Sequence, residues 1–190
     1  MVSFNQLKKR KFMEFSKYTP HQTEQIHQLF IETFTDSEGP EEGKIIGRLV
    51  QDLMASPDKE NIIGFIATES GVIIAGIFFT RLTFESDVNA FILAPVAVHT
   101  DHQGKGVGQA LIHYGLDCLK QDGVELAFTY GDINFYSKVG FEHIDESIAR
   151  APLTLSYPKG WLAQSLISDH IEPIPGNTRC VPEFNKPEYW

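Results

Sequence analysis

The first third of the chain carries apolar side chains mainly at helical spacing. Residues 14–18 read as a short strand. Residues 23–35 and 45–54 place apolar side chains three or four positions apart, which is typical of amphipathic helices. Between these two segments, residues 36–43 (DSEGPEEG) are acidic and rich in turn-forming residues. The pattern therefore predicts a strand followed by two helices that an acidic loop connects.

The apolar pattern then changes to runs that are typical of strands. Residues 61–68 and 71–83 are β-rich and are separated by a tight turn, which predicts a hairpin. Residues 90–98 carry almost no polar side chain, as expected of a strand that is buried on both faces. Helical spacing returns in residues 106–122, and residues 125–130 read as another strand. This succession of strand, helix and strand predicts one βαβ crossover.

The last part of the chain predicts shorter elements and a tail. Residues 132–139 read as a short helix, and residues 141–144 and 153–157 read as strands. Residues 161–190 are rich in proline and end in a pair of aromatic residues. Because a free tail rarely keeps many aromatic side chains, we expect this extension to pack on the domain.

The elements follow the order β-α-α-β-β-β-α-β-α-β-β. This order predicts an α+β fold (α/β three-layer), in which helices cover both faces of a central twisted sheet that is mixed but mostly antiparallel. We divide the chain into a basic N-terminal arm (1–12), one domain (13–160) and the C-terminal extension (161–190).

Composition narrows the class of protein. The 190 residues carry a net charge of −9, which argues against general binding of nucleic acid. The two cysteines, Cys118 and Cys180, have no CxxC spacing, so we expect neither a disulfide framework nor a metal site. No apolar run approaches the roughly 18 residues that a membrane helix needs, and the N-terminus lacks the pattern of a secretory signal. We therefore expect a cytoplasmic protein that does not bind membranes.

Three glycines follow the buried strand at alternate positions. Gly104, Gly106 and Gly108 lie in the sequence HTDHQGKGVG, where the strand gives way to the helix. Glycine allows a ligand to approach the backbone, and the free N–H groups of a helix N-terminus favour an anion such as a pyrophosphate. Lys105 can add a positive charge.

Two familiar phosphate-binding motifs do not fit this segment. A P-loop requires Lys followed by Ser or Thr after its last glycine, but Gln109 and Ala110 follow Gly108. In the dinucleotide-binding motif the third glycine comes one residue later, and that fold needs several βαβ units.

The residues resemble the GNAT superfamily of N-acetyltransferases instead. The sequence QGKGVG (103–108) is similar to the Q/R-x-x-G-x-G/A signature of that family, and NFYSKVGF (134–141) is similar to its second cofactor motif. The resemblance implies a GNAT-like acyl-CoA N-acyltransferase fold. It also implies transfer of an acetyl group from acetyl-CoA (coenzyme A) to a primary amine of a small molecule or peptide, directly and in a ternary complex.

The resemblance also implies roles for single residues. The backbone of residues 96–98 would align pantetheine beside a bulge at Pro95, residues 103–108 would hold the pyrophosphate, and Tyr136 would protonate the leaving thiolate as the general acid. The implied cofactor contacts are Val96, Ala97, Val98, Gln103, Gly104, Lys105, Gly106, Val107, Gly108, Asn134 and Tyr136. Asn134 could equally cap its short helix.

The general base stays open at this point. The strand before the bulge offers no carboxylate, which leaves Glu41, Glu42, Glu85, Asp87 or a water molecule. The identity of the acceptor and the length of the acyl chain also stay open, and a homodimer is compatible with the sequence. A non-catalytic module that binds or senses acyl-CoA is the alternative from a different class.

Overall fold

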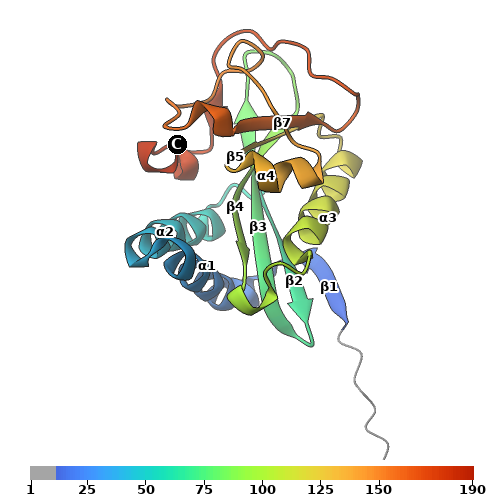
Figure 1. The fold of residues 1–190 in the computed structure, drawn as a ribbon. Coiled ribbons are helices and arrows are strands. Elements are labelled where there is room, and N and C mark those ends of the chain that lie inside the picture. Colours follow the sequence, from blue (N-terminus) through green and yellow to red (C-terminus); the bar gives the residue numbers. More distant parts are fainter. Residues whose placement is uncertain (1–11) are drawn as a thin grey trace, which may run out of the picture.

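Within residues 12–190, which the computed structural model describes, the chain forms an eight-stranded sheet (Figure 1). Its strand order is β1-β2-β3-β4-β5-β7-β6, and β8 pairs with β3 outside this path. The strands are β1 (Met13–Lys17), β2 (Ile62–Glu69), β3 (Val72–Thr83), β4 (Ala90–Val98), β5 (Leu126–Tyr130), β6 (Glu142–His143), β7 (Trp161–Ser165) and β8 (Arg179–Cys180). All pairs are antiparallel except β4 with β5.

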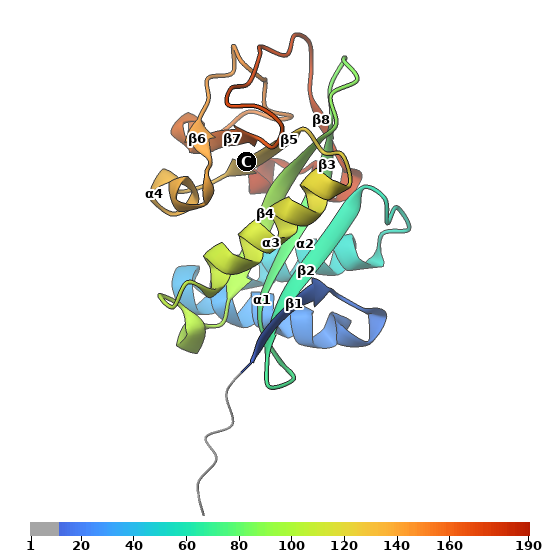
Figure 2. The same cartoon turned by 90° about the vertical axis from the view of Figure 1, so that its right-hand side faces the viewer.

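The longer helices cover opposite faces of this sheet. They are α1 (Thr23–Glu38), α2 (Pro40–Ala55) and α3 (Val107–Gln121), and α4 (Ile133–Tyr136) is a single turn. Figure 2 shows α3 in front of the sheet and α1 and α2 behind it. Side chains along β4 alternate between the two faces: Ile92 packs in the core under α1 and α2, while Phe91 and Leu93 pack in the core under α3. The predicted fold class is confirmed, and the single βαβ crossover runs through α3.

The acidic segment 36–43 is helical, so the predicted loop is wrong. α1 continues through Glu38, and α2 begins at Pro40, which leaves Gly39 with a φ of 99° as the only break. Proline suits the first turn of a helix, and the carboxylates of Glu41 and Glu42 are favourable near the positive end of the helix dipole. Gly39 and Pro40, which disfavour the interior of a helix, therefore mark the start of α2.

The strand predicted over residues 153–157 is also wrong. That segment is irregular and lies between Pro152 and Pro158, and the strand forms later, as β7. β7 pairs with both β5 and β6, and its first residue, Trp161, is fully buried and stacks on Phe128 with ring centroids 5.2 Å apart. The sheet therefore continues past residue 160. The predicted N-terminal arm lies outside the described residues, except for the exposed Phe12.

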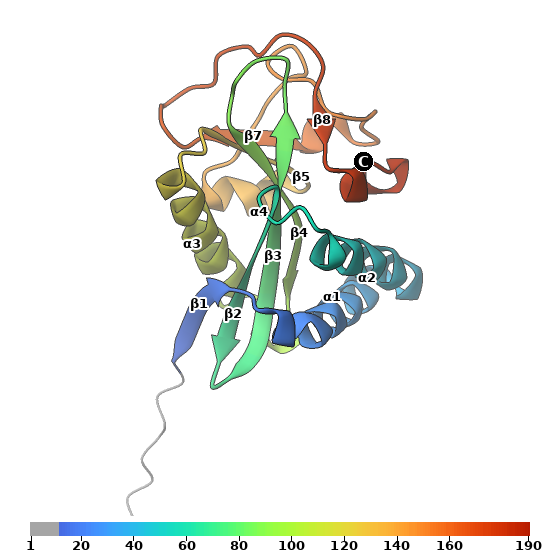
Figure 3. The ribbon, with the colours of Figure 1, turned by 180° about the vertical axis from the view of Figure 1, so that it is seen from behind.

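The last residues, 181–190, fold back beside α2, and we call them the C-terminal segment (Figures 1 and 3). Trp190 is only 4% exposed and stacks on Tyr130 at 6.1 Å. Its indole nitrogen donates a hydrogen bond to the carbonyl of Phe184 (3.0 Å). Lys186 pairs with Asp52 of α2 at 3.3 Å. Burial of the aromatic rings and these polar contacts hold the segment on the domain.

No helix among residues 12–190 has the length and apolar character that crossing a membrane requires.

The packing of α3 on the sheet yields a stability prediction. A Cβ atom at Gly115 would lie 2.6 Å from Cε2 of Phe79 and 3.2 Å from Cδ2 of Phe65. We expect Gly115→Val to lower the free energy of unfolding by roughly 2 kcal/mol through overpacking, measured by urea denaturation. His113→Val, on the exposed side of the same helix, is the control and should change it by less than about 0.5 kcal/mol. Equal midpoints for the two variants would contradict this packing.

Candidate active site

The sheet opens between β4 and β5. Their parallel pairing ends at Leu93 and Thr129, so the residues of β4 after Leu93 do not pair with β5. On the other side of β4, the register with β3 shifts, and Ala94 and Pro95 together stand opposite Phe78. This is the bulge at Pro95 that the resemblance implied. Because β4 and β5 part here, the backbone of residues 96–98 borders an opening in the sheet.

The glycine-rich loop leads from β4 into α3. Gly104 and Gly106 have φ angles of 70° and 79°, and a Cβ atom on either would meet nothing within 4 Å. Both positions therefore favour glycine for its conformation, and both face open space. Gly108 is packed more closely, because its Cβ would lie 3.0 Å from Val98 and 3.5 Å from Phe135.

The polar side chains of the loop brace its backbone. The amide of Gln103 donates to the carbonyl of Val98 (3.0 Å), and the ammonium of Lys105 donates to the carbonyl of Asp101 (2.6 Å). α3 then begins at Val107 with Gly106 as its N-cap. The first N–H groups of this helix have no partner within the helix and form a site suited to an anion.

A cleft of about 580 Å³ extends from this loop along β4 towards α4. The predicted cofactor contacts that line it are Val96, Val98, Gln103, Gly104, Gly106, Val107, Gly108 and Tyr136. Three other predicted contacts do not line it. The side chain of Ala97 is buried in the core under α1 and α2, Lys105 turns to Asp101, and the amide of Asn134 donates to Asp132 (2.9 Å). Asp132, and not Asn134, is the N-cap of α4.

Tyr136 lies at the end of α4, against the inner wall of the cleft. Its ring is half-buried and packs edge-to-face on Phe141 with centroids 5.8 Å apart. Burial raises the pKa of Tyr136 above its ordinary value of 10.0, and the nearby hydroxyl of Thr129 offsets part of this effect. The hydroxyl therefore keeps its proton at neutral pH and can donate it.

A second, smaller cavity of about 220 Å³ adjoins the cleft. Phe34, Val96 and Tyr136 line both spaces, so these side chains form the boundary between them. The remaining walls come from α2, from the bulge of β4, from Tyr130 of β5 and from the C-terminal segment. A ligand in this cavity and a ligand in the cleft would thus meet beside Tyr136.

Only one of the four candidate carboxylates lines this cavity. Glu42 borders it from the first turn of α2. Glu41 is exposed and forms an ion pair within α2, Glu85 accepts hydrogen bonds from Asn177 (3.0 Å), and Asp87 is exposed. The structure therefore brings Glu42 and Tyr136 to the same cavity and leaves the other three carboxylates outside it.

The surroundings of Glu42 favour its protonated form. Burial raises the pKa of Glu42 above the ordinary value of 4.5, and the negative charges of Glu38 and Glu188 raise it further. The neighbouring Glu41 shows the opposite effect, because its hydrogen bond and ion pair with Lys44 lower its pKa. A carboxylate with a raised pKa is a better proton acceptor than an ordinary one.

Sequence reasoning missed some residues of these two spaces. Phe34 lies within the helix predicted over residues 23–35, but the sequence does not indicate its position in the boundary between the cleft and the cavity. Phe184, Glu188 and Tyr189 line the smaller cavity from the C-terminal segment. The aromatic residues of the C-terminal extension indicated that it packs on the domain, but they did not indicate which surface it covers.

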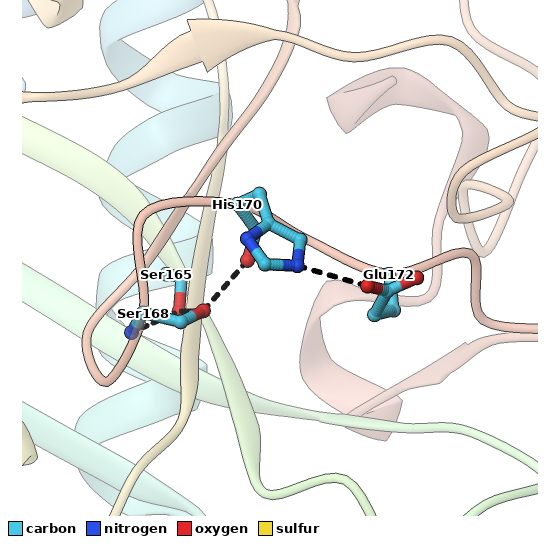
Figure 4. A network of polar contacts seen from close by, with 4 residues as sticks. All are labelled: Ser165, Ser168, His170 and Glu172. Carbon is cyan, nitrogen blue, oxygen red and sulfur yellow. Dashed lines mark hydrogen bonds and ion pairs between the residues drawn. The ribbon is translucent and has the colours of Figure 1, made fainter.

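A cluster of Ser165, Ser168, His170 and Glu172 lies near β7, apart from both spaces (Figure 4). It holds the residue types of a hydrolase triad, but not the geometry. The Ser168 hydroxyl donates to the main-chain carbonyl of His170 (2.7 Å), while the ring of His170 pairs with Glu172 at 2.8 Å. The imidazole therefore does not contact the serine that it would have to activate.

The sheet that opens beside β4, with a glycine-rich loop at the start of α3, defines the class of GNAT-fold acetyltransferases. The family profile described as "Acetyltransferase (GNAT) domain" matches residues 14–144. The chain belongs to this family of N-acetyltransferases, and the family that the two sequence motifs resemble is confirmed.

Two relatives from Escherichia coli K12 are similar in sequence. The protein named uncharacterized N-acetyltransferase YjhQ is 31% identical over 146 residues, which cover 74% of this chain and 78% of that protein. The protein named uncharacterized N-acetyltransferase YhbS is 33% identical over 96 residues, which cover 50% of this chain and 52% of that protein.

Solved structures show the same fold. The structure of Escherichia coli YhbS in complex with CoA superposes with a TM-score of 0.73 and 25% identity, covering 93% of each chain. A GNAT acetyltransferase from Brucella melitensis in complex with acetyl-CoA superposes with a TM-score of 0.72 and 22% identity, covering 92% of this chain and 99% of that one.

Proposed function

We propose that this protein transfers the acetyl group of acetyl-CoA to the primary amine of a small molecule or peptide, by direct transfer in a ternary complex. The observation that carries the proposal is the position of Tyr136, in the boundary between the cleft and the smaller cavity. A thioester in the cleft and an amine in the cavity can meet there, beside a proton donor.

The cleft suits acetyl-CoA as a co-substrate. The N–H groups at residues 103–108 would donate hydrogen bonds to the pyrophosphate, and Lys105 would add positive charge beside it. The opening between β4 and β5 leaves the backbone of residues 96–98 accessible to pantetheine amides, so Ala97 contributes through its main chain. Asn134 would contact the cofactor only after releasing Asp132.

Gly106→Ala tests the pyrophosphate site. The new methyl group would project into the open space beside the start of α3, so we expect the Kd of acetyl-CoA to rise about tenfold, measured by calorimetry. Gly123→Ala is the control, because Gly123 has the same φ of 79° and the same open surroundings at the other end of α3. We expect both variants to lose a similar amount of stability, because alanine is strained at this φ. Only Gly106→Ala should weaken the binding of acetyl-CoA, because only Gly106 lies at the cleft. An equal loss of affinity in both would argue against this site.

The proposed reaction uses Glu42 and Tyr136 as a base and acid pair. Glu42 takes a proton from the acceptor ammonium and passes it to solvent, and the neutral nitrogen attacks the thioester carbonyl. The N–H of Val96 at the bulge would stabilise the oxyanion. As the C–S bond breaks, the sulfur takes the proton of Tyr136, and the proton that the new amide nitrogen loses restores the tyrosine through water. One amide, one free thiol and one proton result.

Release of free CoA thiol from acetyl-CoA, measured against a panel of primary amines, tests this function. We expect thiol release that depends on the amine and initial-rate plots that intersect when both substrates are varied. Parallel lines would indicate an acetylated enzyme and contradict direct transfer. Binding of acetyl-CoA without turnover of any amine would support the acyl-CoA-binding module instead.

A further inference from the structure

The charged side chains that line the smaller cavity are all negative. Its lining includes two carboxylates, Glu42 and Glu188, and among the described residues no lysine, arginine or histidine lines it. The remaining walls are apolar or aromatic, with Ile46 and Leu49 from α2 and Phe184 from the C-terminal segment. Such a cavity favours an apolar stem that carries positive charge, and it disfavours a carboxylate.

The C-terminal segment is held firmly enough to act as a wall of this cavity. Lys186 pairs with Asp52 of α2, and the carbonyl of the buried Trp190 accepts a hydrogen bond from the backbone of Ser156 (2.9 Å). Glu188 and Tyr189 lie between these two anchor points. Both residues line the cavity.

Tyr189 contributes an aromatic side chain to the wall of this cavity. Its ring stacks on Phe184 with centroids 5.6 Å apart, and the ammonium of Lys186 lies 5.8 Å from the ring centroid. Tyr130 of β5 lines the same cavity, and its ring stacks on Trp190, so stacked aromatic side chains form this part of the wall.

Resting on the proposed function, we propose that the acceptor is a small aliphatic diamine: one amine reacts between Glu42 and Tyr136, and Glu188 holds the second ammonium group. The two carboxylates come from elements far apart in the sequence, α2 and the C-terminal segment. Their approach is unfavourable without a cation between them, because the negative charge of Glu188 raises the pKa of Glu42. A doubly charged ligand compensates for that repulsion.

Three acceptors of matched stem length test this proposal. They are 1,4-diaminobutane, butylamine and 4-aminobutanoate, compared by kcat/KM for thiol release from acetyl-CoA. The wild-type protein should prefer the diamine to butylamine by roughly tenfold, the size expected for one charged contact, and butylamine to 4-aminobutanoate. Glu188→Gln should abolish most of the preference for the diamine. Glu183→Gln removes the same charge from the same segment outside the cavity, and should keep the wild-type ratio.

The outcomes separate this proposal from the proposed function. If the wild-type protein acetylates the three amines equally, or prefers 4-aminobutanoate, the diamine proposal is overturned and the acetyltransferase stands. If Glu188→Gln and Glu183→Gln keep the same ratio, Glu188 does not hold the second cation. If acetyl-CoA binds but no amine in the wider panel releases thiol, the proposed function itself fails. The wild-type comparison decides the substrate class even if a variant does not fold.

Discussion

Tyr136→Phe should lower kcat for acetyl transfer by at least roughly 100-fold, the lower end of what a general acid contributes. The change removes one hydroxyl and keeps the ring that packs on Phe141. Without that hydroxyl, the thiolate must leave unprotonated or take its proton from water. The Kd of acetyl-CoA should change little, because the loop before α3 and the backbone of β4 are intact.

Tyr114→Phe is the matched control for this experiment. Tyr114 lies in α3, packs on Phe65 at 5.6 Å and lines neither the cleft nor the cavity, so its variant should keep wild-type kcat. Because the pKa of Tyr136 is raised above 10.0, the wild-type rate should not decline at high pH until the pH exceeds 10. Equal kcat for the two variants would remove Tyr136 from the chemistry.

Glu42→Gln should lower kcat/KM at pH 7 by a similar factor, roughly 100-fold. The amide cannot accept the proton of the acceptor ammonium. In the proposed mechanism only the carboxylate form of Glu42 accepts the proton, so the wild-type rate should fall as the pH drops through the raised pKa of Glu42. Glu38 and Glu188 are the charges that raise it, while Lys44 acts on Glu41 instead. The variant should lose this acidic limb of the pH profile.

Glu41→Gln provides the control for Glu42→Gln. It removes a carboxylate from the same helical turn, but one that is exposed and outside the cavity, so kcat/KM and the acidic limb should persist. The melting temperature of Glu42→Gln distinguishes a loss of catalysis from a loss of folded protein. A raised pKa means that the charged form of Glu42 opposes folding at neutral pH, so Glu42→Gln should not lower the melting temperature. A lowered melting temperature together with an unchanged pH profile would contradict the assignment.

The bulge of β4 and the glycine-rich loop, where we propose that the cofactor binds, were largely predictable from the sequence. A buried strand, alternating glycines and a helix start lie next to each other in the chain, so local chemistry defines the loop. Gly104 and Gly106 illustrate this, because their positive φ angles are a property of single residues. The bulge at Pro95 was equally local, since proline cannot donate to a β-ladder.

The smaller cavity, where we propose that the acceptor binds, was not predictable, because it depends on contacts between distant segments. Glu42 could not be separated from Glu41 until α2 was seen to begin at Pro40, which fixes the side of the helix that each occupies. Glu188 reaches the cavity only because Trp190 is buried at the end of the chain. The misplaced last strand had the same cause, since burial of Trp161 between distant elements outweighed the local pattern of residues 153–157.

A crystal structure with acetyl-CoA bound tests the central claim most directly. The account predicts the pyrophosphate at the N–H groups of residues 103–108 and pantetheine along residues 96–98. It also predicts the thioester sulfur within hydrogen-bond reach of the Tyr136 hydroxyl, about 3–3.5 Å, with the acetyl group facing the smaller cavity. A thioester that points away from Tyr136, or a cofactor bound outside the cleft, would contradict it.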